Sequence, residues 1–117
     1  MSIEAAGQRT IAAVFDLRLP ASREALRKVV GTENVPQFEA SNQPLVVLIV
    51  EAPHGKLARM AFADEERLLE FYLTTLRANT QLAPQDRVQF VLRDVAPTLE
   101  VAVSQATREL AREFTGA

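Results

Sequence analysis

The feature that most constrains the fold is an uninterrupted aliphatic run, Leu45–Val50, which lies between Pro44 and the pair Ala52 and Pro53. A run of this length suits a strand and is too short for a helix. An apolar run without alternation is typical of a strand buried on both faces. We therefore expect the run to form the most buried strand of a sheet. The 117 residues can bury roughly two thirds of their unfolded surface, so we expect residues 1–117 to form a single domain.

Alternation of apolar and polar residues predicts three more strands. Residues 9–19 place apolar side chains at the odd positions from 11 to 19, which gives that strand one core face. Lys56–Phe62 alternates after a turn at Pro53–Gly55, and Arg87–Val95 carries Val88, Phe90 and Leu92 on one side. The sequence thus predicts four strands in all.

Capping residues and helical spacing predict three helices. Ser22 can cap a short helix that stops at Gly31, and Asp64 can cap a longer helix with Glu65 and Glu66 in its first turn. Apolar residues from Leu99 to Phe114 repeat at helical spacing after Pro97, which suits a first helical position. The alternation of residues 99–103 leaves open whether 97–114 is wholly helical.

The order of these elements is strand, helix, strand, strand, helix, strand, helix. This order favours an α+β fold of the ferredoxin-like βαββαβ type, an antiparallel sheet with two helices on one face and an additional C-terminal helix. A layered α/β arrangement is the alternative. We expect residues 32–44, which contain two prolines, to form a long loop, and residues 1–8 to be a flexible N-terminus.

The helix-free face of such a sheet would carry several apolar side chains. A large exposed apolar patch normally marks an interface, so we predict that a second copy covers this face in a homodimer. The alternative is a monomer whose last helix folds across it. The candidate interface residues are Val14, Leu57, Val91, Leu110 and Phe114.

Composition restricts the possible partners and chemistry. The 13 basic and 15 acidic residues give a net charge of -2, which predicts no attraction to nucleic acid. The absence of cysteine excludes thiol catalysis and thiolate metal sites, and we expect no metal and no cofactor. No apolar run reaches about 18 residues, so we expect no membrane span and a cytoplasmic location.

Four charged residues form a candidate ligand site. Arg18, Arg59 and Arg93, with Asp16, are each expected on the helix-free face of a strand. Convergent guanidinium groups could hold a carboxylate or phosphate, and therefore a small anionic ligand. Cross-strand ion pairing is the alternative role.

No motif in the sequence indicates catalysis. The four glycines are isolated and His54 is the only histidine. We therefore predict a non-enzymatic binding or assembly module that self-associates and recognises a protein or small ligand through the open sheet face or the C-terminal helix. One alternative is a small dimeric ferredoxin-like enzyme, of isomerase or anion-binding type, with a pocket between sheet and helix that uses His54, Glu51, Tyr72 or the arginines. A second is a structural component of a larger bacterial or viral assembly.

Overall fold

A four-stranded mixed sheet forms the centre of this α+β domain. The computed structural model describes residues 10–40, 42–51 and 56–115, so the predicted flexible segment 1–8 and His54 lie outside the described residues. The strands are β1 (Thr10–Asp16), β2 (Leu45–Glu51), β3 (Lys56–Phe62) and β4 (Val88–Arg93). Their order is β3-β2-β1-β4, with β1 antiparallel to β2, β2 antiparallel to β3, and β1 parallel to β4. All four predicted strands are confirmed.

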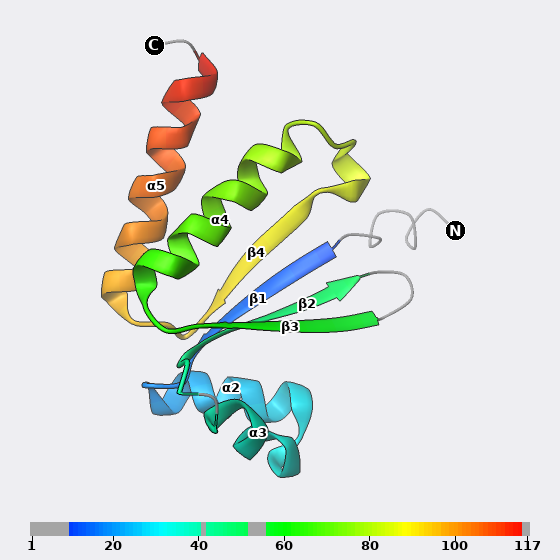
Figure 1. Ribbon diagram of the computed structural model, residues 1–117, viewed down its shortest axis with the longest axis vertical. Coiled ribbons are helices and arrows are strands. Elements are labelled where there is room, and N and C mark those ends of the chain that lie inside the picture. Colours follow the sequence, from blue (N-terminus) through cyan, green and yellow to red (C-terminus); the bar gives the residue numbers. More distant parts are fainter. Residues whose placement is uncertain (1–9, 41, 52–55, 116–117) are drawn as a thin grey trace.

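Helices cover both faces of the sheet (Figure 1). After β1 come α2 (Pro20–Val30), the 3₁₀ helix η1 (Thr32–Asn34) and α3 (Val35–Glu39), all on one face, which we call the α2 face. The opposite face, which we call the α4 face, is covered by α4 (Glu65–Asn79) and α5 (Pro97–Thr115). A short 3₁₀ helix, η2 (Pro84–Asp86), precedes β4. Residues 97–115 are thus helical throughout.

The sheet is not wholly antiparallel, so this part of the prediction is wrong and the ferredoxin-like arrangement is not confirmed. The helical connection after β1 returns the chain to an adjacent antiparallel strand, β2. The connection through α4 then carries the chain from β3 at one edge to β4 at the other. Helical connections are long enough to lead to either edge and either direction, so the order of elements alone does not determine which strands pair.

The prediction that one face lacks helices is also corrected. It placed Val14 together with Leu57 and Val91, but the observed register puts Val14 on the α4 face and the other two on the α2 face. The reason is that β1 is a central strand with apolar residues on both sides. The alternation of residues in β1 therefore does not show which of its side chains lie on the same face of the sheet as given side chains of the other strands.

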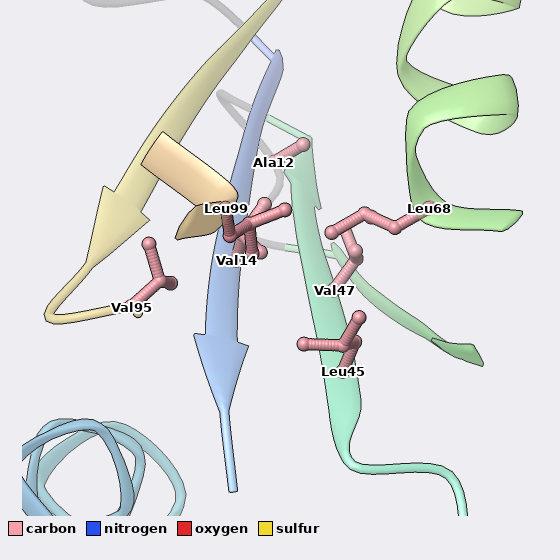
Figure 2. Packing of buried hydrophobic residues seen from close by; sticks show 7 residues of the cluster. All are labelled: Ala12, Val14, Leu45, Val47, Leu68, Val95 and Leu99. Atoms are coloured by element: carbon pink, nitrogen blue, oxygen red, sulfur yellow. The ribbon is translucent and has the colours of Figure 1, made fainter. Parts of the chain in front are cut away.

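The larger core lies between the sheet and the pair α4 and α5. Leu68 of α4 points toward Val47 of β2, and Leu99 of α5 lies over Val14 of β1 (Figure 2). The rings of Phe71 and Tyr72 on α4 extend this core. The other members of the buried cluster are Ala12, Leu45 and Val95. Burial of this apolar surface is the main force that fixes α4 across the sheet.

A second core lies on the α2 face and corrects the prediction of a loop over residues 32–44. Within that range the chain forms η1 and α3, and Phe38 of α3 packs with Phe15 and Leu26. Proline disrupts a helix when it lies in the interior, but it is well accommodated in the first turn. Pro36 lies in the first turn of α3. The remaining members of the cluster are Leu17, Ala25, Val46 and Leu48.

Helix ends follow the predicted caps with one exception. The Asp64 side chain accepts a hydrogen bond of 2.9 Å from the backbone N–H of Arg67, and Gly31 ends α2 at a φ of 90°. Ser22, however, does not cap α2, which begins at Pro20 after Leu19. Within the described ranges, no helix combines the length and apolar composition needed to span a bilayer.

Candidate functional site

The predicted arginine site is not assembled, because Arg59 and Arg93 lie at opposite edges of the sheet. Arg59 is in the edge strand β3 and Arg93 is in the edge strand β4, with β2 and β1 between them. At about 4.8 Å per strand, roughly 14 Å separates the two strands. The Arg59 guanidinium instead lies 4.9 Å from the centre of the Phe38 ring. These arginines cannot hold one small anion together.

Asp16 and Arg18 do come together, but they bind each other. Arg18 Nε and Nη2 donate hydrogen bonds of 2.8 Å to the two carboxylate oxygens of Asp16, whose side chain is fully buried. Arg18 Nη2 also donates to Glu65 Oε2 at 3.2 Å. Two carboxylates therefore already neutralise this guanidinium, which ties the end of β1 to the start of α4.

The ion pair shifts the titration of both groups. Burial alone raises the pKa of Asp16, but the hydrogen bonds and charge of Arg18 outweigh burial, and the pKa lies below its ordinary value. The hydrogen bond to Asp16 raises the pKa of Arg18 above its ordinary value. Both groups stay charged near neutral pH, as expected of a structural ion pair.

Buried Ser22 links the carboxyl ends of β1 and β4. Its hydroxyl donates a hydrogen bond of 2.7 Å to the backbone oxygen of Arg93 and accepts one of 2.6 Å from the backbone N–H of Asp16. This use of the hydroxyl explains why Ser22 is not a helix cap. Three of the four predicted ligand residues thus lie at one end of the sheet, but the contacts of Asp16 and Arg18 are internal to the protein.

The predicted interface residues divide into buried and exposed groups. Val14 is only 1% exposed and Leu110 only 5%, so in the single chain they present almost no surface to a partner. Val91 is partly buried on the α2 face. Leu57 is 51% exposed and Phe114 is 56% exposed, and both are accessible. Of these two, only Leu57 belongs to the sheet.

Leu57 is one end of an apolar row that crosses three strands. The strand register pairs Ile11 with Val50 and Val50 with Leu57, and all three side chains are exposed on the α2 face. In Figure 1, α2 and α3 lie beneath the end of the sheet where β1 finishes. The row lies at the other end, where β1 begins, so these helices leave it uncovered.

The strand that contributes Leu57 is also the open edge of the sheet. Ala58, Arg59 and Met60 of β3 are exposed, and among the described residues no hydrogen bond reaches its outer edge. Both of its sides are largely apolar, with Leu57 and Ala61 on the α2 face. Arg59 is the one charged side chain described on this strand, and its guanidinium is held over Phe38.

The opposite edge, in β4, is protected where it begins. The Asn79 side chain donates a hydrogen bond of 2.9 Å to the backbone oxygen of Val88 and accepts one of 3.0 Å from its backbone N–H. The amide of Asn79 thus replaces a neighbouring strand at this position. Unpaired edge strands are templates for pairing with another chain. Among the described residues, no side chain forms hydrogen bonds of this kind with the outer edge of β3.

Among the described residues, neither the titratable groups nor the metal-binding side-chain types form a competing candidate site. The groups whose pKa values are shifted, Asp16, Arg18, Glu24 and Arg27, are members of ion pairs. Residues 10–40, 42–51 and 56–115 contain no group of three His, Cys, Asp or Glu side chains placed to hold a metal ion. The open edge of β3, together with its apolar row, is therefore the candidate functional site.

No family model, curated protein or solved structure matches this chain. The candidate site therefore rests on the geometry alone. Sequence reasoning identified Leu57 but did not identify β3 as an edge, because strand order is not visible in the alternation. One signal was present in the sequence, since the segment LARMA contains a single charge.

Proposed function

We propose that this chain is a self-associating assembly module in which two copies pair through β3. The observation that carries the proposal is that β3 is an exposed edge strand with apolar side chains on both of its faces. The guanidinium of Arg59, the charged side chain described on this strand, lies over the Phe38 ring of α3. Pairing would satisfy the free backbone groups of each edge and cover apolar surface at the same time.

The sequence of β3 is self-complementary in one antiparallel register. Centred on Met60, that register sets Ala58 opposite Phe62 of the second copy and Arg59 opposite Ala61, so apolar side chains meet and no two charges oppose each other. Centred on Arg59, it would instead bring two guanidinium groups together, and like charges directly opposite are destabilising. Met60 therefore marks the expected two-fold axis.

The dimer would leave the apolar row of each copy uncovered. A two-fold axis normal to the sheet keeps the α2 faces of both copies on the same side. In the register centred on Met60, Leu57 lies opposite residue 63 of the second copy, so the two rows of Ile11, Val50 and Leu57 would lie on the same side of the joined sheet, one on each side of the two-fold axis. They would offer two surfaces for a protein partner. Self-association and partner recognition would thus use adjoining parts of the sheet.

The molar mass in solution tests the proposal. We expect sedimentation equilibrium at high micromolar concentration to give twice the mass of one chain, and Met60→Lys to give a monomer, because an inward-facing charge on an edge blocks pairing. Met60 is 38% exposed, so the lysine can reach water in the monomer.

Val29→Lys is the matched control, because Val29 is also an exposed apolar side chain, at 50%, but lies on α2. This variant is expected to remain a dimer. A wild-type mass equal to one chain, or an unchanged dimer for Met60→Lys with a normal circular dichroism spectrum, would refute the proposal.

A further inference from the structure

Two adjoining hollows lie beside α2 and α3, away from the β3 edge. One, of about 270 Å³, lies between α2, α3 and the chain that leads into β2. The other, of about 380 Å³, lies between α2 and α3. Arg23 of α2 and Glu39 of α3 line both hollows. One basic and one acidic residue therefore line the same small space.

The floor of the smaller hollow is apolar. Leu17 and Phe38 line it and are otherwise buried members of the core on the α2 face, and Pro44 completes it. These residues are held by packing against the sheet, so the floor is formed before any ligand arrives. A preformed apolar floor with a few polar groups at its rim is typical of a small-molecule site.

The two charged groups at the rim are not used by the fold. Neither Arg23 nor Glu39 forms an ion pair or a side-chain hydrogen bond with another described residue. Nearby on α2, by contrast, Arg27 is paired with Glu24. Opposite charges that line one space without joining each other leave one site for an anionic group and one for a cationic group.

We propose that the hollow binds an apolar α-amino acid. The carboxylate of the ligand pairs with the Arg23 guanidinium in two parallel hydrogen bonds, and its ammonium group binds the Glu39 carboxylate. The apolar side chain lies on Leu17 and Phe38. This site is separate from the β3 edge and does not depend on self-association.

Size and charge both select this class of ligand. A volume of about 270 Å³ lies just below the range of roughly 300–1,000 Å³ typical of sites for drug-sized ligands, which leaves room for an amino acid. A simple carboxylic acid would satisfy Arg23 but would leave the Glu39 carboxylate without a cation to neutralise it. A zwitterion satisfies both groups.

Isothermal titration calorimetry with L-phenylalanine tests the site. We expect saturable binding, and binding at least about tenfold weaker for 3-phenylpropanoate, which lacks the ammonium group, and for 2-phenylethylamine, which lacks the carboxylate, because each loses one charge-assisted contact. Equal binding of either analogue, or no binding of L-phenylalanine, would overturn the proposal.

Variants locate the contacts. Arg23→Gln and Glu39→Gln should each weaken L-phenylalanine binding about tenfold or more, whereas Lys28→Gln, which removes a charge from α2 without lining either hollow, should not. Unchanged binding in either of the first two variants would contradict the site. Met60→Lys should bind as the wild type does, so a failure of self-association would not be mistaken for a failure of this site.

Discussion

At the scale of single residues, the ion pair of Asp16 and Arg18 is the clearest case of a polar contact that determines structure. The Asp16 carboxylate is buried, and the Arg18 side chain gives it two hydrogen bonds and a neutralising charge. Removing one partner of a buried pair leaves the other without compensation, which costs more than the pair itself contributes. The stability of the fold should therefore depend on the charge of Asp16.

We expect Asp16→Asn to lower the free energy of unfolding by about 2 to 3 kcal/mol at neutral pH, the value of a hydrogen-bonded charged group. The folded state lowers the pKa of Asp16 below its ordinary value, so this contribution is present above the ordinary pKa and is lost as the pH falls through the folded pKa. Wild type should thus lose stability below about pH 4 by more than Asp16→Asn does.

Urea unfolding at several pH values measures this effect, with Asp86→Asn as the control for loss of an exposed carboxylate outside the ion pair. A cost below about 0.5 kcal/mol for Asp16→Asn, or identical pH profiles for variant and wild type, would show that the pair is not important for stability.

Sequence reasoning selected Asp16 and Arg18 but assigned them the wrong partner. Residues two apart in a strand share a face, which explains why the two could be expected together. Arg59 and Arg93 have the same local pattern, yet they end on opposite edges of the sheet. Local spacing decides whether two residues of one strand can meet. The order of strands in the sheet decides whether residues of different strands can meet.

At the scale of elements, prolines were the main source of error. Pro20 and Pro36 stand in the first turns of α2 and α3, whereas the sequence suggested a helix that starts later and a loop. The same residue type ends a helix or begins one according to its position. Helices with a cap or a long apolar stripe, α4 and α5, could be predicted close to their observed limits.

If α3 is part of the core, Phe38→Ala should lower the free energy of unfolding by about 3 to 5 kcal/mol, the cost of removing a buried aromatic side chain. Val29→Ala, at an exposed position on α2, should cost less than about 0.5 kcal/mol. Denaturant unfolding monitored by circular dichroism compares the two. A loss below about 1 kcal/mol for Phe38→Ala would show that residues 35–39 do not contribute to the core.

At the scale of the whole molecule, the surface available for assembly follows from strand order. The sequence correctly indicated exposed apolar surface at Leu57, but it placed that surface on a sheet without helices on one side. In the structure, helices cover both faces, and the open surface is reduced to the β3 edge and the row beside it. Strand pairing depends on contacts between distant segments, so it could not be derived from local pattern.

The chain contains no cysteine, so a single engineered cysteine reports on one position. In the register centred on Met60, two copies of residue 60 face each other at a Cα separation of roughly 4.5 to 5.5 Å, which is compatible with a disulfide. The most direct test is therefore the fraction of disulfide-linked dimer formed by Met60→Cys under mild oxidation, compared with Val29→Cys. We predict rapid and nearly complete linkage for Met60→Cys and little for Val29→Cys. Equal, slow linkage of the two variants would contradict pairing through β3.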